Sequence, residues 1–329
     1  MGGDHGPGVV AEGLALAFRD MPGRFQITLV GDETAIRSAL KQHHAENFGI
    51  EIVHADEQID MAEKAAQAVR RKGSSLGVLT QLHKDRKVDA MFSAGNTGAV
   101  VASALIVLGR LEGVSRPALA AILPNASGGT VVLDVGATSD CKPGYLVQFA
   151  HMGAVYARYL LGRQNPRVGL LSIGEEPTKG NAFVLETRPL LEQAAHLNFA
   201  GHVEGRDIFK GGTDVVVTDG FTGNVVLKTA EGVAGFMTDM VRHELQHDWL
   251  ARAGAGLMLP ALKRLRAKID WEEFGAAPLL GVDGVCFIGH GSSKAKAFHS
   301  AIRTLTRFVE HRVNEHIREE IQADHVTAA

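Results

Sequence analysis

Short apolar runs rich in β-branched residues alternate with longer segments of helical periodicity along the chain. Strands that are apolar throughout and separated by helices are typical of a mainly parallel sheet covered on both faces. No low-complexity linker interrupts this alternation, so the pattern predicts one continuous α/β unit over residues 1–329. The expected strands are Phe25–Val30, Ile50–His54, Val88–Ser93, Ala118–Leu123, Thr130–Val135, Arg167–Ile173, Asn198–Val203, Asp214–Thr218 and Gly284–Ile288.

Helices are expected between these strands, and one region breaks the alternation. The segment from Trp249 to Trp271 fits poorly, and we expect an insertion or a helical arm near residues 245–270. The expected helices are Glu33–His43, Asp60–Lys72, Thr97–Gly109, Pro143–Leu161, Phe183–Ala195, Asn224–Trp249 and Ser293–Ile321.

Composition excludes several classes of protein. The net charge of −3 gives no basis for nucleic-acid binding. The longest nearly apolar run, Ala99–Gly109, is half of the ~20 residues that a membrane-spanning helix needs. The start of the chain has neither the basic nor the apolar stretch of a signal peptide. Cys141 and Cys286 form no CxxC pair, which indicates a reducing cytoplasm.

The 38 glycines are clustered, and five expected strands end in polar turns that contain glycine and lead into a helix. Glycine lets the backbone approach a ligand, and a helix start offers N–H donors and a positive dipole end, so such turns bind oxyanions. A single turn of this kind is equally well explained as a loop with a helix cap that binds no ligand. Five of them together indicate a phosphate-type site at the carboxyl ends of the strands. The turns are Gly95–Gly98, Asp134–Thr138, Gly174–Glu176, Asp219–Asn224 and His290–Ser293.

Two of these turns belong to an internal repeat. Residues 88–101 align without gaps on residues 213–226, with six identical positions, among them Thr97/Thr222 and Gly98/Gly223. Each copy predicts a strand, a glycine turn and the start of a helix. We interpret the pair either as related loops that face one cleft or as two segments that are alike by chance and because both follow the common strand–turn–helix pattern.

Other motifs argue against particular chemistries. Neither GxxxxGK[ST] nor a GxGxxG after a strand occurs, so no nucleotide cofactor is implied. Residues 243–247 read HELQH and match the HExxH zinc helix, but no adjacent motif supplies a third ligand, although Glu272 or Glu273 could supply one; we expect no metal. Residues 73–77 match GxSxG, yet a helix rather than a strand is expected before the serine, so a loop is predicted instead of a nucleophile elbow.

An ordered set of motifs resembles the PlsX family, the acyl-acyl-carrier-protein:phosphate acyltransferases of bacterial phospholipid synthesis. The resemblance runs from Met1 to about Arg307. The motifs are MGGDHGP, SAGNTGA, DVGATSDCKP, QFAHMGAVYA, GLLSIGEE with TKG, VEGRDI, DGFTGNVVLKTAEG, GAAPLLGVDG and GHGSS.

The resemblance implies a three-layer α/β/α fold related to phosphotransacetylase and isocitrate dehydrogenase, found as a homodimer in the cytoplasm. It implies that acyl carrier protein thioester and inorganic phosphate give acyl phosphate and free thiol, without a cofactor. The family places a short strand before MGGDHGP, whereas this chain begins at that methionine. We expect either that the start was assigned late or that the first strand is missing and the sheet lacks a member. Thr138-Ser139 and Ser172 stand where the family has other residues.

Phosphate dianion is already a competent nucleophile, so the enzyme needs to bind it, position it and stabilise an oxyanion. No Ser-His-Asp or Cys-His constellation is needed, and none is evident. Lys179 is the expected cation, and Asn96 and Asn224 are the expected hydrogen-bond donors. Further phosphate contacts are predicted at Thr97, Gly98, Thr222, Gly223, His290, Ser292 and Ser293, the last three as a helix cap as well. Asp4 and His5 are weaker candidates, and Asp219 is expected to fix its turn.

Two other functions stay open: a phosphotransacetylase-like enzyme acting on small acyl-CoA, and a non-catalytic scaffold of lipid synthesis. Residues 257–269 combine an apolar side with Lys263, Arg264, Arg266 and Lys268. Within residues 249–269 this pattern predicts either a helix packed on the body or the dimer partner, or a docking surface for acyl carrier protein or an anionic membrane face.

Overall fold

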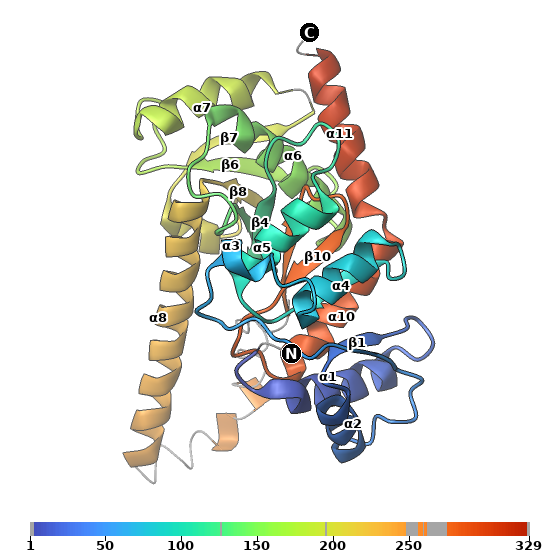
Figure 1. The fold of residues 1–329 in the computed structure, drawn as a ribbon. Helices are drawn as coiled ribbons and strands as arrows, with labels where there is room; N and C mark the ends of the chain where they lie inside the picture. Colours follow the sequence, from blue (N-terminus) through green and yellow to red (C-terminus); the bar gives the residue numbers. More distant parts are fainter. Residues whose placement is uncertain are drawn as a thin grey trace.

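The computed structural model describes residues 3–125, 127–194, 196–247, 256–258, 260–261 and 275–327. An eight-stranded sheet lies between two layers of helices (Figure 1). In spatial order its strands are β3 (Ala90–Ser93), β10 (Val285–Ile288), β9 (Ala277–Leu280), β4 (Ala118–Leu123), β5 (Thr130–Leu133), β8 (Val215–Val217), β6 (Arg167–Leu171) and β7 (Asn198–Val203). The predicted α/β fold with a mainly parallel sheet is therefore confirmed.

Alternation along the central strands builds a core on each face of the sheet. In β5, Val131 and Leu133 pack with one cluster of buried residues, whereas Val132 between them packs with the other. The first cluster is covered by α6 (Pro143–Leu160), α7 (Ala182–Gln193), α10 (Ala295–Glu310) and α11 (Val313–Thr327). The second is covered by α3 (Ala65–Ala68), α4 (Ser75–Lys84), α5 (Thr97–Ser103), the 3-10 helix Gly205–Phe209 and the first turns of α8 (Gly220–His247).

The strands of this sheet run in two directions. β10 is antiparallel to β9, β9 to β4 and β4 to β5, while the remaining pairings are parallel. Consequently β3, β10 and β4 run one way, and β9, β5, β8, β6 and β7 run the other way. The expectation that all five glycine turns gather at one edge is wrong. The turns after β3 and β10 leave one end of the sheet, and those after β5, β6 and β8 leave the other.

A smaller sheet stands apart from the large one. β1 (Thr28–Gly31) pairs in parallel with β2 (Glu51–His54), and α1 (Gly6–Asp20) and α2 (Glu33–Gln42) cover this pair. α1 also packs along α10, which joins the small unit to the main body (Figure 1).

Several predicted elements need correction. The helix expected at Asp60–Lys72 is reduced to α3. The helix expected at Thr97–Gly109 is an α-helix only as far as Ser103 and continues as a π-helix over Ala104–Leu108. The helix expected at Ser293–Ile321 breaks at Arg312, where φ is 51°. The GxSxG segment is not a loop: Ser74 accepts a hydrogen bond from the Gly77 N–H and begins α4. The serine of the motif, Ser75, is the first residue of α4, and no strand leads into it, so rejection of a nucleophile elbow holds.

The structure also contains elements that were not predicted: α1, α4 and β9. α1 begins at Gly6 with Pro7 in its first turn, a favourable start for a helix that reads as a loop in sequence. β9 contains Pro278, which argues against a strand. α8 reaches His247, but most of the helical arm predicted near residues 245–270, including all four basic residues of 257–269, lies outside the described residues.

Candidate functional site

Three of the five glycine turns meet at one end of the sheet. β5, β8 and β6 are adjacent and parallel, so the segments that follow them, residues 134–138, 218–224 and 172–180, leave the sheet side by side. We take this end as the candidate active site.

Asp134 forms the floor of the site. Its carboxylate is fully buried and accepts hydrogen bonds from the backbone N–H groups of Leu119 at 2.8 Å, Gly136 at 3.0 Å, Ala137 at 2.9 Å and Thr138 at 2.6 Å. Burial raises the pKa of this carboxyl above its ordinary value, and the four donors offset part of that shift. The N–H groups of this turn are therefore occupied within the protein and do not face a ligand.

Two glycines let α8 begin directly against this floor. A Cβ on Gly220 would lie 2.6 Å from the Asp134 carboxylate, and a Cβ on Gly223 would overlap the Asp134 carbonyl oxygen. Side chains at these positions would push α8 away from β5. Both glycines therefore pack closely against Asp134, a partner that sequence reasoning missed. A phosphate contact from Gly223 stays a prediction.

The start of α8 is capped internally. Asp219 accepts a hydrogen bond from the Thr222 N–H at 2.8 Å and one from the Thr222 hydroxyl at 2.7 Å. The prediction that Asp219 fixes its turn is confirmed, and Thr222 serves the same turn. Asn224, in contrast, is exposed, lies beside Gly136 and makes no side-chain hydrogen bond within the part of the chain described here.

Lys179 is presented by a tight loop after β6. The Ser172 hydroxyl donates to its carbonyl at 3.2 Å, and its own N–H donates to the Glu176 carbonyl at 3.0 Å. Its aliphatic stem crosses Gly174, where a Cβ would lie 2.9 Å from the Lys179 Cγ. The side chain is exposed, and among the described residues its ammonium group forms no ion pair. The Lys179 ammonium group and the Asn224 amide are thus available to bind a ligand at this end of the sheet, whereas the backbone N–H groups of residues 136–138 are not.

Apolar side chains stand exposed at the same end of the sheet. Ile173, after β6, is 81% exposed, and Phe221, in the first turn of α8, is 68% exposed. These residues were not among the predicted site residues, although Ile173 directly precedes one predicted glycine turn and Phe221 lies within another. An apolar chain bound at this end of the sheet could therefore pack against these two side chains.

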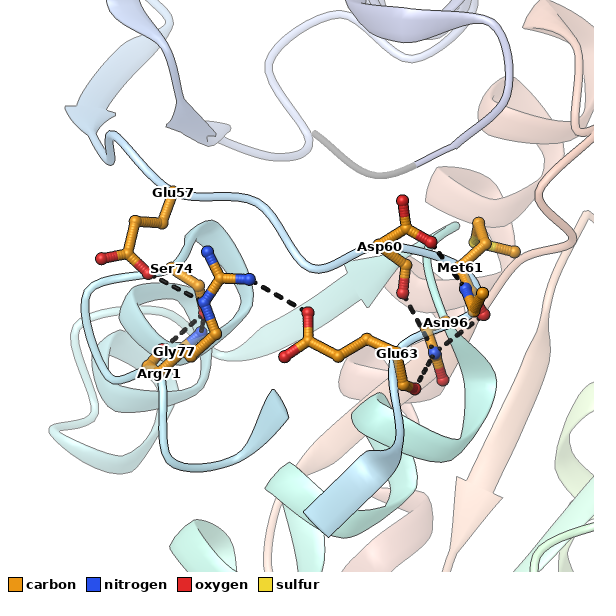
Figure 2. Close-up of polar contacts among 9 residues, drawn as sticks. Glu57, Asp60, Met61, Glu63, Arg71, Ser74, Gly77 and Asn96 are labelled. Carbon is orange, nitrogen blue, oxygen red and sulfur yellow. Dashed lines mark hydrogen bonds and ion pairs between the residues drawn. The ribbon is translucent and has the colours of Figure 1, made fainter. Parts of the chain in front are cut away.

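The opposite end of the sheet holds the other predicted residues. Asn96 donates from its side-chain nitrogen to the carbonyls of Asp60 at 3.2 Å, Met61 at 3.0 Å and Glu63 at 2.8 Å, and its side-chain oxygen accepts from the Ala99 N–H at 2.9 Å (Figure 2). Its amide therefore caps α5 and holds the loop before α3. A phosphate contact from Asn96 stays a prediction.

Arg71 closes that loop from its other side. Its guanidinium contacts Glu57 at 2.9 Å and Glu63 at 3.0 Å (Figure 2). Thr97 and Gly98 are exposed at the start of α5. The Asp4 N–H donates to the Gly291 carbonyl at 2.9 Å, while His5 precedes α1 without a side-chain cap.

The serines after β10 do not cap α10, so this part of the prediction is wrong. The residue before α10 is Lys294, and it makes no side-chain cap. His290 pairs with the Ser292 hydroxyl at 2.7 Å instead, and the buried Ser293 hydroxyl has no partner within the described residues.

The two copies of the internal repeat have the same secondary structure, but their turns lie at opposite ends of the large sheet. Each copy forms the predicted strand, turn and helix, as β3–α5 and β8–α8, and both helices pack on the same face of the sheet. Because β3 and β8 run in opposite directions, their turns lie at opposite ends, and the hypothesis that they face one cleft fails for the turns.

Cysteine chemistry finds no support at the site. The Cys141 thiol donates to the Thr138 carbonyl at 3.3 Å, and burial raises its pKa to about 11, so the thiolate that would attack a substrate is disfavoured. Among the described residues no group of His, Cys, Asp and Glu side chains is arranged to hold a metal ion. No described helix is both long and apolar enough to cross a membrane.

Comparison with known proteins places these features in context. A family model described as "Fatty acid synthesis protein" matches residues 1–316. A phosphate acyltransferase from Pelotomaculum thermopropionicum is 48% identical over 100% of this chain and 95% of its own. Another from Heliobacterium modesticaldum is 48% identical over 98% of this chain and 96% of its own.

Solved structures with a similar fold are more distant in sequence. A phosphotransacetylase from Streptococcus pyogenes aligns with a TM-score of 0.60 at 17% identity, covering 93% of this chain and 92% of its own. EutD phosphotransacetylase from Staphylococcus aureus aligns with a TM-score of 0.56 at 14% identity, covering 92% and 98%. The predicted likeness to the phosphotransacetylase fold is confirmed.

Proposed function

The chain belongs to the fatty acid synthesis protein family, the PlsX-type phosphate acyltransferases, and from this premise we propose that it transfers a fatty acyl group from acyl carrier protein to inorganic phosphate. The product is an acyl phosphate, made in the cytoplasm for phospholipid synthesis. Identity of 48% to phosphate acyltransferases over the whole chain supports the transfer to phosphate. The donor and the product are part of the proposal.

The reaction needs one bond formed and one broken. A phosphate oxygen attacks the thioester carbonyl carbon, the carbonyl oxygen takes negative charge, and the C–S bond then breaks to release the carrier thiolate. Positioning the dianion and stabilising the developing oxyanion are the tasks left to the protein.

The observation that carries this mechanism is the Lys179 ammonium group, which forms no ion pair with any described residue. It lies at the same end of the sheet as the Asn224 amide, which makes no side-chain hydrogen bond within the described part of the chain. In our proposal Lys179 binds the phosphate dianion, because a charge-assisted contact is stronger than a neutral one. Asn224 donates a hydrogen bond to phosphate or to the oxyanion. Ile173 and Phe221 are available to contact the first part of the acyl chain.

Phosphate-dependent thiol release tests this function. We expect the purified protein to release thiol from palmitoyl-acyl carrier protein when phosphate is present and to be inactive without it, as measured with a thiol reagent. Acetyl-CoA with phosphate is the control substrate, because faster turnover of acetyl-CoA would identify a small-acyl phosphotransacetylase. Equal release with and without phosphate would indicate a thioesterase, and no release under any condition would favour a scaffold.

We also propose that the protein works as a homodimer that pairs through α8. This helix carries an exposed apolar stripe at helical spacing, formed by Val233, Phe236, Met237, Met240 and Val241, and it extends beyond the sheet (Figure 1). Such a stripe fits the same stripe of a second copy across a two-fold axis.

Charge placed in the stripe should separate the copies. We expect Phe236→Glu with Met240→Glu to change a dimer into a monomer in sedimentation velocity experiments at micromolar concentration. Lys228→Glu, on the same helix but off the stripe, is the control and should leave the dimer intact. A wild-type chain that sediments as a monomer would contradict the proposal.

A further inference from the structure

A buried histidine, His202, lies at the end of the sheet that holds the candidate active site. It is the last residue but one of β7 and is 5% exposed. Parallel pairing places it beside Leu170 of β6, which packs in the core that α6 and α7 cover. Neighbouring side chains in register share a face of the sheet, so the His202 ring lies on the α7 side.

One hydrogen bond joins this ring to the loop that carries Lys179. The ring Nδ1 lies 3.0 Å from the Glu176 carbonyl oxygen. Because a carbonyl can only accept, Nδ1 carries the proton and donates it to this bond. The same carbonyl also accepts the Lys179 N–H at 3.0 Å. His202 and the backbone of Lys179 therefore share one acceptor.

The loop has few other attachments to the body of the protein. At its ends, the Ser172 hydroxyl donates to the Lys179 carbonyl at 3.2 Å. Residues 175–178 between them are exposed. In the part of the chain that the structure describes, the bond from His202 is the only hydrogen bond that ties residues 173–178 to another element. Without this bond the middle of the loop would lose its anchor, and with it the turn that presents the Lys179 ammonium group.

Packing alone does not account for a histidine at position 202. Its second ring nitrogen, Nε2, is buried and has no hydrogen-bond partner among the described residues. A buried polar atom without a partner lowers stability, and an apolar side chain at this place would avoid that loss. An apolar side chain could not, however, donate to the Glu176 carbonyl. The hydrogen bond to the loop is therefore what the histidine contributes.

We propose that His202 is a positioning residue for Lys179. It holds the Glu176 carbonyl, fixes the loop after β6 and so keeps the ammonium group in the geometry that phosphate needs. This inference rests on the proposed function, in which Lys179 binds the phosphate dianion. His202 does not touch the substrate and acts through Lys179. A contact contributes fully to the rate only when it is held in the reacting geometry, so loosening the loop should slow the reaction.

Substitutions at position 202 separate the hydrogen bond from the packing of the ring. The side-chain nitrogen of Asn takes the place of Nδ1, whereas that of Gln takes the place of Nε2. We expect His202→Ala and His202→Gln to lower kcat/KM for phosphate about 10-fold, measured as thiol release from palmitoyl-acyl carrier protein. His202→Asn should stay within about twofold of the wild type.

His83→Ala is the matched control for the loss of a buried histidine. His83 is 2% exposed and hydrogen-bonds to the backbone of Val88 at 3.0 Å and of Val285 at 2.8 Å. These contacts lie next to β3 and β10, at the edge of the sheet opposite β7. We expect His83→Ala to lower Tm and to leave kcat/KM for phosphate unchanged.

A double-mutant cycle tests whether His202 acts through Lys179. In the Lys179→Ala background, His202→Ala should change the residual rate by less than about twofold, because the group that it positions is gone. Amide hydrogen exchange adds a readout that needs no turnover. We expect the Lys179 N–H to exchange about 10-fold faster in His202→Ala than in the wild type or in His202→Asn.

These outcomes decide between the inference and the function on which it rests. Wild-type kcat/KM in His202→Ala, equal rates for the Asn and Gln variants, or an undiminished loss in the Lys179→Ala background would each overturn the role of His202. A wild-type protein that releases no thiol with phosphate would refute the proposed function instead. Hydrogen exchange then decides the inference: faster exchange that Asn restores supports the anchoring of the loop, and unchanged exchange in His202→Ala refutes it.

Discussion

Replacing Lys179 by alanine is expected to weaken phosphate use by roughly 10- to 100-fold, because a hydrogen bond to a charged group contributes about 1.5–3 kcal/mol. The effect should appear as a higher KM for phosphate, a lower kcat, or both, depending on whether the contact strengthens in the transition state. Initial rates of thiol release over a phosphate series provide the measurement. The expected size follows from the absence of any described ion pair that already engages the ammonium group.

Two controls separate this effect from a change in fold or in net charge. Lys41→Ala removes an exposed lysine from α2, far along the chain from the three turns, and should leave the rates unchanged. Lys179→Arg keeps the charge but changes the donor geometry, so partial activity is expected. A Lys179→Ala variant with wild-type phosphate dependence and a wild-type melting curve would remove this residue from the site.

Much of the fold was predictable because the strands are short runs of buried β-branched residues. β4 and β7 coincide with the expected segments residue for residue. β9 could not be predicted in this way, since it contains Pro278, and the neighbouring strands tolerate the N–H that this proline lacks. α1 was missed because its glycines and proline resemble a turn, although α1 packs along α10 and its small residues allow that approach.

The lengths of two loops fix the relative direction of two pairs of strands. Only six residues separate Leu123 from Thr130, and four separate Leu280 from Val285. A parallel crossover needs a dozen residues or more, so both pairs had to be antiparallel. Together with the antiparallel pairing of β9 with β4, which these loop lengths do not fix, the two constraints place the turns after β3 and β10 opposite those after β5, β6 and β8.

The candidate site was harder to predict because its donors are shared with the fold. Glycine turns at helix starts suggested free N–H groups, but Asp134 accepts three of them at residues 136–138, and the Asn96 amide caps α5. Sequence patterns locate such turns without revealing which internal acceptor occupies them. Lys179 and Asn224 emerge from the same patterns as the side chains left available for a ligand.

Asp134 gives the largest expected effect on stability. Asp134→Ala would leave four backbone N–H groups without an acceptor, one of them the buried Leu119 N–H. Each buried donor left unsatisfied costs about 1–3 kcal/mol. Since water can reach some of the turn, we expect a total loss of about 3–5 kcal/mol in the free energy of unfolding, measured by urea denaturation at pH 7.

Asp140→Ala is the matched control, because Asp140 is an exposed carboxylate two residues beyond the end of this turn and should change the stability by less than about 0.5 kcal/mol. Asp134→Asn keeps the shape and one acceptor oxygen, so an intermediate loss is expected. The ordering of the three variants carries the argument. If Asp134→Ala loses the most stability and Asp134→Asn recovers part of that loss, the Asp134 side chain stabilises the fold through its hydrogen-bond acceptors rather than through its volume or its charge. An Asp134→Ala variant as stable as Asp140→Ala would show that the turns after β5 and β8 keep their positions without this carboxylate.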